Sequence, residues 1–283
     1  MMYGSHLSVA GGMHKALNAA AELGLDCVQV FTKNQQTWNA PPLAEAAVAE
    51  WEATKQRLKS GPVVSHGSYL INLASPDETL WQKSIKLFLE EVRRCDALGI
   101  PFLVTHPGAH VGTGDEAGLK RIAEALDVVH AELPKSKTIT CLESTAGQGT
   151  CLGHRLEHLA EIISLVKQPK RLGVCLDTCH LFAAGYDFRG KKYDAFRKEL
   201  DTVVGLKHVH VWHLNDSKKP LGSRVDRHEH IGLGAIGESG FEPIVRDKTW
   251  EKTPKILETA KEAHPDGRPW DAVNLETLKR LQG

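Results

Sequence analysis

Short apolar runs alternate with helical patterns along the whole chain. The runs are rich in β-branched residues, and the segments between them carry apolar residues at i, i+3 and i+4 spacing. The first pattern is typical of buried strands and the second of helices that bury one face. One helical face extends from Leu80 to Leu98, and another from Ile122 to Leu133. We expect eight strands, which are Gly4–Val9, Cys27–Phe31, Pro62–His66, Phe102–His106, Thr138–Glu143, Leu172–Asp177, Lys207–His213 and Lys255–Glu258.

This alternation predicts an α/β fold. Eight strands in 283 residues correspond to about 35 residues per unit, the size of a strand, its helix and their loops. No Pro-, Gly- or Ser-rich linker and no block of like charges divides the sequence. We therefore predict a single domain over 1–283 that forms a closed (β/α)₈ TIM barrel. Periodicity alone leaves an open doubly wound sheet as the alternative.

The composition narrows the class of protein. Hydrophobic residues at 41% and charged residues at 25% are ordinary for a globular chain and exclude a disordered or fibrous one. The 35 basic and 35 acidic residues cancel, which argues against binding nucleic acid by bulk charge alone. Without a signal-peptide pattern, a membrane-spanning run or a Cys-x-x-Cys pair, we expect a cytoplasmic protein with reduced cysteines and no membrane partner. Fifteen histidines are the one unusual count.

Polar residues stand at the ends of six predicted strands. They are 34 to 45 residues apart, about one βα unit each time, so a barrel gathers them at its C-terminal rim, where active sites of this fold lie. Imidazole and carboxylate groups are good ligands for divalent metals. A single such residue is most often solvated, but six in phase with the repeat are not independent. The six are His66, His106, Glu143, Asp177, His213 and Glu258.

The seventh strand indicates the direction of one of these side chains. Because side chains alternate along a strand, the apolar face of Val209 and Val211 leads to His213 and points it into the barrel mouth. The opposite face carries His208, His210 and Trp212. We expect both of those histidines to lie between strand and helix in a structural role.

Two further clusters extend the candidate metal site. His180 follows Asp177 by one helical turn, which places a second imidazole beside that carboxylate. Asp226 and His228 follow the seventh strand, and in an extended segment their spacing turns both side chains toward one ion. Five histidines and four carboxylates are too many for one tetrahedral zinc. They suit a cluster of two or three metals that share bridging carboxylates.

Long motifs follow one another from the first strand to the last. They are HLSVAGG (6–12), VFTKNQ (30–35), HGSYLINL (66–73), THPGAH (105–110), LESTAGQG (142–149), CLDTCHLFAAGYD (175–187), HLNDSK (213–218), RVDRHEHIGLGAIG (224–237) and ILET (256–259). Together they closely resemble the endonuclease IV family of apurinic/apyrimidinic (AP) endonucleases, which are DNA-repair enzymes. The resemblance covers nearly the whole chain.

The resemblance implies a (β/α)₈ barrel with three zinc ions in its mouth, with Mn²⁺ as an alternative at one site. Carried over position by position, one ion is held by His66, His106 and Glu143, a second by Glu143, Asp177, His213 and Glu258, and the third by His180, Asp226 and His228. All nine positions match the candidates found above.

The family reaction is hydrolysis of the phosphodiester 5′ to an abasic site in double-stranded DNA, which leaves a 3′-hydroxyl and a 5′-deoxyribose phosphate. Blocking groups on 3′ ends are removed as well. Zinc makes water available as a nucleophile near neutral pH, and Glu143 is the candidate to orient or deprotonate that water. No nucleotide cofactor is implied, and we expect a monomer.

The resemblance further implies that rim side chains fill the gap left when the damaged nucleotide leaves the helix. Tyr69 and Leu70 match these positions, although alone they would be interpreted as a hydrophobic cap on the rim. Gln35 and Gln36, after the second strand, are the other candidates for DNA contact. Family members often carry an arginine where Gln36 stands, so this chain keeps the hydrogen bonding there and lacks the charge.

Several other motifs and histidines are not assigned to the candidate metal site. The segment 232–237 fits G-x-G-x-x-G, but no strand leads directly into it, so we expect a tight loop and no dinucleotide site. Glu276 stands in a second LET string within a predicted C-terminal helix, so we assign the metal to Glu258 instead. We expect His6 and His110 to support the ligands. The histidines expected to be solvated are His14, His130, His154, His158 and His264.

Two other functions remain open. A sugar isomerase or epimerase of the same barrel type needs about four ligands at strand ends. It has no use for His180, Asp226 and His228, which favours the nuclease. A DNA-binding module without catalysis predicts binding to damaged DNA that survives chelation, and the complete ligand set argues against it.

Overall fold

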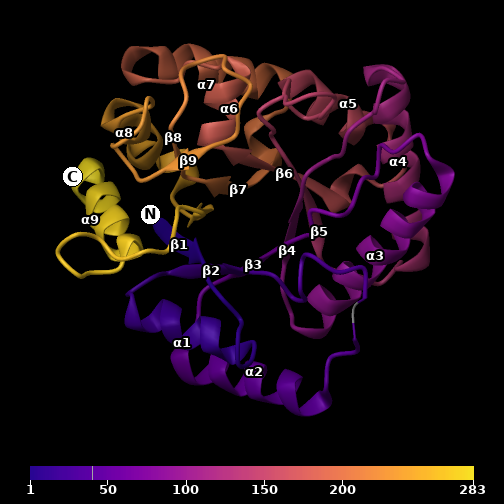
Figure 1. Cartoon of the computed structure of the whole chain (residues 1–283), viewed down its shortest axis with the longest axis horizontal. Coiled ribbons are helices and arrows are strands. Elements are labelled where there is room, and N and C mark those ends of the chain that lie inside the picture. Colours follow the sequence, from indigo (N-terminus) through magenta and orange to yellow (C-terminus); the bar gives the residue numbers. More distant parts are fainter. Residues whose placement is uncertain (40) are drawn as a thin grey trace.

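The computed structural model describes residues 1–39 and 41–283, and over these residues eight parallel strands form a closed barrel. Figure 1 shows the strands around the centre of the view with the helices outside them. Because β1 pairs with both β2 and β10, the sheet has no free edge, which confirms the barrel and excludes the open sheet. The barrel strands are β1 (Met2–His6), β2 (Cys27–Val30), β3 (Val63–His66), β4 (Phe102–Thr105), β5 (Ile139–Glu143), β6 (Leu172–Asp177), β7 (Val209–His213) and β10 (Pro254–Leu257).

Helices between the strands cover the outside of the barrel. In α3 the predicted face is observed, since Ile85 and Val92 are buried against the core, and the helix begins where the Asp77 carboxylate accepts a hydrogen bond from the Leu80 N–H. The helices are α1 (His14–Glu22), α2 (Glu45–Leu58), α3 (Glu78–Ala97), α4 (Asp115–Glu132), α5 (Leu156–Leu165), α6 (Thr178–Ala184), α7 (Tyr193–Val203), α8 (Glu238–Arg246) and α9 (Trp270–Gln282), with short 3₁₀ turns at Pro169–Arg171, Gly190–Lys192, Leu206–His208 and Lys248–Trp250.

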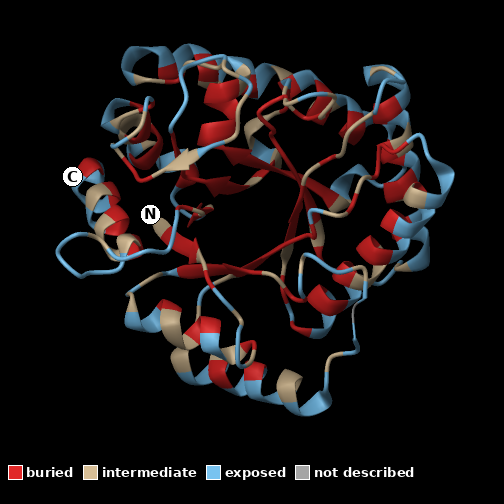
Figure 2. Cartoon of the chain, viewed as in Figure 1, coloured by how far each residue is buried: buried red, intermediate tan, exposed pale blue. Residues whose placement is uncertain are grey.

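The buried apolar residues form two clusters, one outside the barrel strands and one inside the barrel. A large layer lies between the strands and the helices, and Figure 2 shows the buried residues concentrated on the strands and on the inward faces of the helices. A small layer fills the barrel interior. Because these inner side chains close the barrel from below, polar groups at the strand ends face the open mouth. The inner residues are Cys27, Val64, Val104, Cys141, Cys175, Val211 and Ile256.

The predicted strand bounds hold at β6 and differ elsewhere by a few residues. β1 begins at Met2 and ends at His6, where the sequence pattern predicted Gly4–Val9. His106 and Glu258 come one residue after β4 and β10 rather than inside them. Both residues remain at the rim, because the C-terminal end of each barrel strand leads directly into a loop at the mouth.

A β-bulge corrects the prediction for the seventh strand. Val174 pairs with Val209, but Cys175 pairs with Val211, so His210 is an extra residue in β7. Val211 and His213 point inward as predicted. Val209, however, joins the outer layer, and His210 stacks on Phe102 beside the inner layer, with ring centroids 5.5 Å apart. Strict alternation therefore holds only beyond the bulge, and the expectation that His210 lies between strand and helix was wrong.

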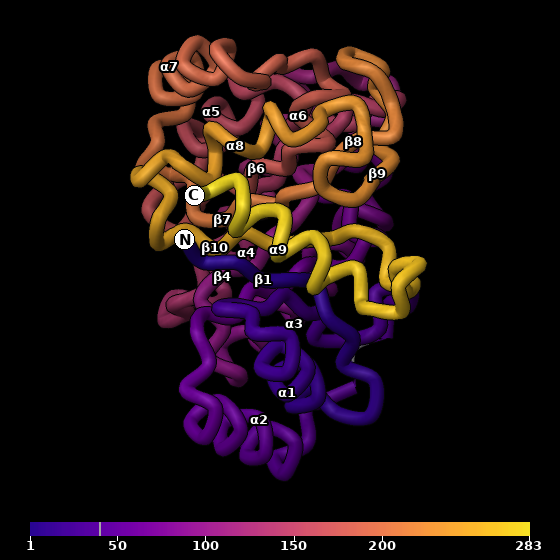
Figure 3. Tube along the Cα trace, turned by 90° about the vertical axis from the view of Figure 1, so that its left-hand side faces the viewer, coloured from indigo at the N-terminus to yellow at the C-terminus, as the bar shows by residue number. Residues whose placement is uncertain are grey.

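A short antiparallel hairpin that the sequence did not predict stands over the mouth. It consists of β8 (Asp216–Ser217) and β9 (His228–Glu229), with Ser217 opposite His228. Figure 3 shows it on the side of the molecule opposite the start of β1 and places the two termini close together. Among the described residues, no helix combines the length and the apolar character that crossing a membrane requires.

Candidate metal centre

Glu143 lies at the centre of a cluster of imidazoles in the barrel mouth. It is the last residue of β5, and its side chain is buried. Oε2 lies 3.0 Å from Nε2 of His66 and 3.2 Å from Nε2 of His106. Oε1 lies 3.1 Å from Nδ1 of His213 and 3.3 Å from Nδ1 of His180. Each carboxylate oxygen therefore faces two imidazoles, an arrangement that allows one carboxylate to serve two ions.

The candidate ligand atoms form groups of a size that fits one ion. In each group, one nitrogen, oxygen or sulfur atom from every member lies within 4.8 Å of the others. The structure thus brings together the six strand-end residues that the sequence predicted, and Glu143 belongs to both of their groups. The first group is His66, His106 and Glu143, and the second is Glu143, Asp177, His213 and Glu258.

The other three predicted residues meet next to Asp177. The Asp226 carboxylate lies between two imidazoles, with Oδ2 3.2 Å from Nε2 of His180 and Oδ1 3.1 Å from Nε2 of His228. Asp177 caps α6 by accepting a hydrogen bond from the His180 N–H at 2.8 Å, which fixes that imidazole one turn beyond the strand. His228 is the first residue of β9 and is held by its ladder, whereas Asp226 lies two residues before that strand, so the ladder covers only the end of the segment that the sequence prediction took as extended.

Cys179 is an additional candidate ligand that the sequence did not reveal. It groups with Asp226 and His228, while His180 and His228 also group with Asp177. Burial raises the pKa of the Cys179 thiol to about 12, so this thiol is protonated at neutral pH in the absence of a metal.

Four of the imidazoles are oriented by an oxygen on their far side. One ring nitrogen of each donates a hydrogen bond to that oxygen. His66 donates to the Gly67 carbonyl and His180 to the Ser144 carbonyl, both at 2.8 Å. His213 donates to Gln29 Oε1 at 2.8 Å, and His228 donates to the Glu258 carbonyl at 3.2 Å. This leaves the lone pair of the other nitrogen facing the carboxylates, as metal-ligating histidines require. In His180 that nitrogen is Nε2, which faces Asp226, whereas Nδ1 faces both the Ser144 carbonyl and Glu143. Nε2 of His228 is buried and has no hydrogen-bond partner among the described residues, and a metal ion would satisfy it.

Two neutral amides that sequence reasoning missed support the cluster. Gln29 accepts from His213 and donates to Glu258 Oε1 at 2.5 Å and to His6 Nδ1 at 2.9 Å, so His6 has its predicted supporting position. Asn215 donates to Asp177 Oδ2 at 2.7 Å and accepts from the Glu258 N–H at 2.8 Å. The signal for Gln29 was one polar residue inside the apolar strand Cys27–Val30, whereas nothing in HLND distinguishes Asn215 from a loop residue.

The charges of the cluster depend on one another. Burial alone would raise the pKa of Glu143, but the imidazoles of His106 and His213 outweigh burial and hold this pKa well below its usual range. Burial would lower the pKa of His180, but Asp177, Asp226 and Glu143 raise it well above its ordinary value. Without cations, the carboxylates therefore attract protons onto the imidazoles. Bound cations would displace those protons.

We compared the sequence with protein families and with proteins of assigned function. Residues 17–281 match the family described as Xylose isomerase-like TIM barrel. A probable endonuclease 4 from Chloroflexus aggregans is 49% identical over 280 residues, which cover 99% of this chain and 97% of that protein. The chain belongs to the endonuclease IV family. A further member from Geobacter sulfurreducens, also a probable endonuclease 4, is 46% identical over 283 residues, covering 98% of this chain and 93% of that protein.

Solved structures agree with the sequence comparison. The crystal structure of endonuclease IV from Thermus thermophilus matches with a TM-score of 0.87 at 35% identity, and covers 99% of this chain and 98% of that one. A D-tagatose 3-epimerase-like protein matches with a TM-score of 0.74 at 18% identity over 99% of this chain and 97% of that one, which shows a shared fold alone. Membership in the endonuclease IV family confirms the resemblance seen in the motifs.

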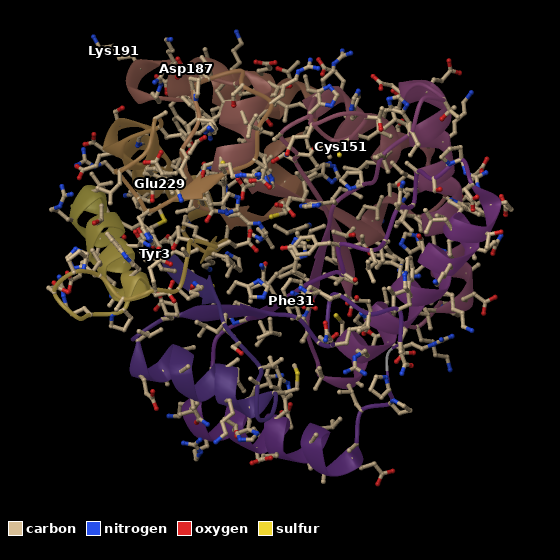
Figure 4. All side chains as sticks on the ribbon, viewed as in Figure 1. Tyr3, Phe31, Cys151, Asp187, Lys191 and Glu229 are labelled. Atoms are coloured by element: carbon tan, nitrogen blue, oxygen red, sulfur yellow. The ribbon has the colours of Figure 1, made fainter. Side chains whose placement is uncertain are left out.

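The residues that this family resemblance assigns to DNA contact lie on two rim loops. Tyr69 is 60% exposed, Gln36 is exposed, and Gln35 and Leu70 are partly buried. Tyr69 lines a pocket of about 350 Å³ together with His106, His180 and Asp226. Phe31, labelled near the centre of Figure 4, meets Tyr69 edge-on with ring centroids 5.7 Å apart. The exposed tyrosine therefore lines the same pocket as three of the candidate metal ligands.

The G-x-G-x-x-G segment binds an anion that belongs to the chain itself. The Asp216 carboxylate accepts hydrogen bonds from the backbone N–H groups of Gly232, Gly234 and Ile236 at 2.9, 3.0 and 2.9 Å. A concave run of N–H groups of this kind is an anion site. Because Asp216 occupies it, the segment is a tight loop anchored to the hairpin, which agrees with setting a dinucleotide site aside.

Three of the remaining histidines differ from expectation. His130 and His158 are buried, at 2% and 3% exposure, and not solvated. His158 accepts from the Gly153 N–H and faces Asp115, and His110 faces the same carboxylate from the other side. His110 therefore holds its own loop to α4 instead of supporting a ligand. Glu276 is an exposed residue of α9 that pairs with Arg268 at 2.8 Å, as expected.

Proposed function

We propose that the protein is an AP endonuclease that uses three metal ions, zinc in the first instance, to hydrolyse the phosphodiester 5′ to an abasic site in double-stranded DNA. The products are a 3′-hydroxyl and a 5′-deoxyribose phosphate, and 3′-blocking groups are removed by the same hydrolysis. The observation that carries the proposal is the position of Glu143, whose two oxygens each face two imidazoles at 3.0 to 3.3 Å. Family membership supports the nuclease activity, and the abasic substrate is our inference from it.

Two of the three proposed ligand sets are groups whose ligand atoms lie within 4.8 Å of one another, and the third rests on two imidazoles that face one carboxylate. His66, His106 and Glu143 would hold one ion, and Glu143, Asp177, His213 and Glu258 a second, with Glu143 shared. The third would lie between His180, Asp226 and His228, where two imidazole nitrogens face one carboxylate and one of them has no hydrogen-bond partner among the described residues. Imidazole and carboxylate donors are those of zinc sites, and a set of three leaves the fourth tetrahedral position open for water or substrate.

The ions would supply an activated water near neutral pH and positive charge against the phosphate. Glu143 is charged at neutral pH, because the surrounding imidazoles hold its pKa well below the usual range despite burial. We assign to it the orientation of the attacking water and the acceptance of its proton. The chain has zero net charge. Nothing in its bulk charge attracts DNA, and we infer that attraction is concentrated at the loaded cluster.

The two rim loops would select the damaged site. Extrusion of a nucleotide is least costly where no base is paired or stacked, which favours an abasic site. We propose that Tyr69 and Leu70 enter the space left in the helix and that Gln35 and Gln36 contact DNA beside them. Tyr69 suits this role because an aromatic ring that is 60% exposed can replace a stacking partner without prior rearrangement.

A metal-dependent sugar isomerase or epimerase is the second candidate. The structural match to an epimerase-like protein supports the shared fold, but its 18% identity carries no chemistry. Four ligands at strand ends suffice for that class. His180, Asp226 and His228 have no place in it, and here both imidazoles face the Asp226 carboxylate, at 3.2 and 3.1 Å.

An incision assay with mapped product ends tests the proposal. The substrate is a labelled duplex with one abasic site, and D-tagatose is offered in parallel. We expect a 3′-hydroxyl and a 5′-deoxyribose phosphate, loss of incision after chelation, recovery with zinc, and no change in the sugar. Turnover of the sugar with an intact abasic strand would overturn the proposal in favour of the epimerase. Binding of damaged DNA that survives chelation without incision would favour a binding module.

A further inference from the structure

A direct hydrogen bond joins the two rim loops proposed to contact DNA. Ser68, on the loop after β3, donates its hydroxyl to the Gln35 carbonyl, on the loop after β2, at 2.6 Å. Ser68 is 4% exposed and precedes Tyr69 and Leu70, while Gln35 precedes Gln36. The same hydroxyl accepts from the Leu70 N–H at 3.3 Å. One buried oxygen thus contacts the backbone of both loops at the residues assigned to DNA.

Helix α3 supports this junction from below with a buried carboxylate. Glu91 is 1% exposed, and its Oε1 accepts from the Ser68 N–H at 3.0 Å. The same oxygen lies 4.0 Å from Nζ of Lys33, whose side chain is 2% exposed. The pair is enclosed, so removing one member would leave the other charge buried and uncompensated.

Lys33 extends the support to the tip of the β2 loop. Its Nζ donates to the carbonyls of Asn34 and Thr37, both at 2.8 Å, and so closes the turn that carries Gln35 and Gln36. The Gln36 N–H donates to Asn34 Oδ1 at 2.9 Å within this turn. The exposed turn at residues 34–37 is therefore held in place by the buried ammonium group of Lys33.

Arg94 anchors the base of the same loop. It lies one helical turn after Glu91 on α3, it is 6% exposed, and its guanidinium donates to the carbonyls of Thr32 and Pro41, the latter at 2.8 Å. Glu91 and Arg94 thus hold the β3 loop and the β2 loop to one helix. Neither residue belongs to the metal cluster, so the metal site does not explain their burial.

We propose that Ser68 is a positioning residue that, with Glu91 and Lys33 beneath it, joins the two loops into one rigid unit presenting Gln36 and Tyr69 to DNA at a fixed separation. The inference rests on the proposed function. Its physical basis is preorganisation, because loops that are already ordered lose less conformational entropy on binding.

The variant Ser68→Ala tests the junction with little loss of packing. Alanine fits the site of serine, but the Gln35 carbonyl and the Leu70 N–H lose their partner. We expect hydrogen exchange in residues 33–37 to accelerate at least tenfold, although the substitution lies in the other loop. We expect the Kd of the zinc-loaded protein for an abasic duplex with a non-hydrolysable linkage 5′ to the abasic site to rise about fivefold to tenfold, with kcat on the cleavable duplex within twofold of wild type. A disturbance of the metal site would instead lower kcat.

Ser84→Ala is the matched control. Ser84 is buried on α3 and accepts from the Asn72 N–H at 3.1 Å, so its hydroxyl holds the β3 loop without contacting the β2 loop. Its loss should leave exchange in 33–37 unchanged, and Ser68→Thr, which keeps the hydroxyl, should restore the wild-type values. Unchanged exchange and unchanged Kd in a folded Ser68→Ala protein would overturn the inference. Because exchange needs no DNA, this outcome is separate from failure of the proposed function, which a wild type unable to incise would show.

Discussion

Replacing Glu143 by glutamine tests the shared carboxylate most sharply. The carboxylate offers Oε2 to His66 and His106, and Oε1 to His180 and His213, at 3.0 to 3.3 Å. An amide keeps one oxygen and turns an NH₂ group toward the other pair of imidazoles. An amide nitrogen of this kind is not a metal ligand, so Glu143→Gln can complete one ligand group and not two. The group that it cannot complete should lose its ion.

The expected loss of rate follows from this geometry. With one ion missing and no base for the attacking water, we expect incision of an abasic duplex to fall by at least a thousandfold, or about 4 kcal/mol of transition-state stabilisation. The Kd for the duplex should rise far less than the rate falls, because the proposed DNA contacts of the rim loops remain although the positive charge of one ion is lost. The assay is single-turnover incision, with metal content and Kd measured on the same preparation.

Glu276→Gln is the matched control for this substitution. Glu276 stands in the second LET string, is exposed and pairs with Arg268, so its neutralisation should leave rate and metal content unchanged. Incision by Glu143→Gln at more than a tenth of the wild-type rate with full metal content would refute both the bridging role and the role as base.

Three further outcomes are expected. Gln36→Arg should tighten binding to abasic duplex and add up to about one unit to the slope of log K against log salt, and an unchanged slope in a salt titration would place Gln36 off the DNA path. Asp216→Asn should lower the melting temperature and loosen residues 230–237 in hydrogen exchange, because the loop N–H groups lose a charged acceptor. A melting temperature equal to that of wild type would show that the anion site is not needed. Burial lowers the pKa of His130 to about 4, whereas the same imidazole titrates near 6.5 in the unfolded chain. The free energy of unfolding should therefore be unaffected by this group above pH 6.5. It should fall by up to about 3 kcal/mol as the pH drops toward 4, because the unfolded chain then binds a proton that the folded chain does not. Urea unfolding at several pH values should show this loss in wild type and a smaller one in His130→Leu, and identical pH profiles would contradict it.

The sequence was sufficient for the barrel and for the location of the cluster. The repeat of about one βα unit between Glu143, Asp177 and His213 translates directly into neighbouring strands that end at one rim, because parallel strands of a barrel share their direction. The i, i+3 spacing of Asp177 and His180 fixed that pair, since the strand ends at the first residue and a helix begins at the next.

Other features depend on contacts that no local pattern encodes. The bulge at His210 breaks the alternation on which its predicted direction rested. Gln29 and Asn215 are neutral and act only through the ligands that they orient. The loop at 232–237 has the composition of a phosphate site, and its occupant, Asp216, lies 16 to 20 residues earlier in the chain. The junction at Ser68 involves a hydroxyl and a backbone carbonyl 33 residues apart, which have no signature in either loop alone.

A zinc titration of the metal-free protein, followed by incision of a duplex with one abasic site, tests whether three ions act together. If the nine side chains hold three ions that act together, incision should recover fully only as about three equivalents per chain are bound, and the cleaved strand should end in a 3′-hydroxyl. Full recovery at one equivalent, or incision that persists without metal, would contradict it.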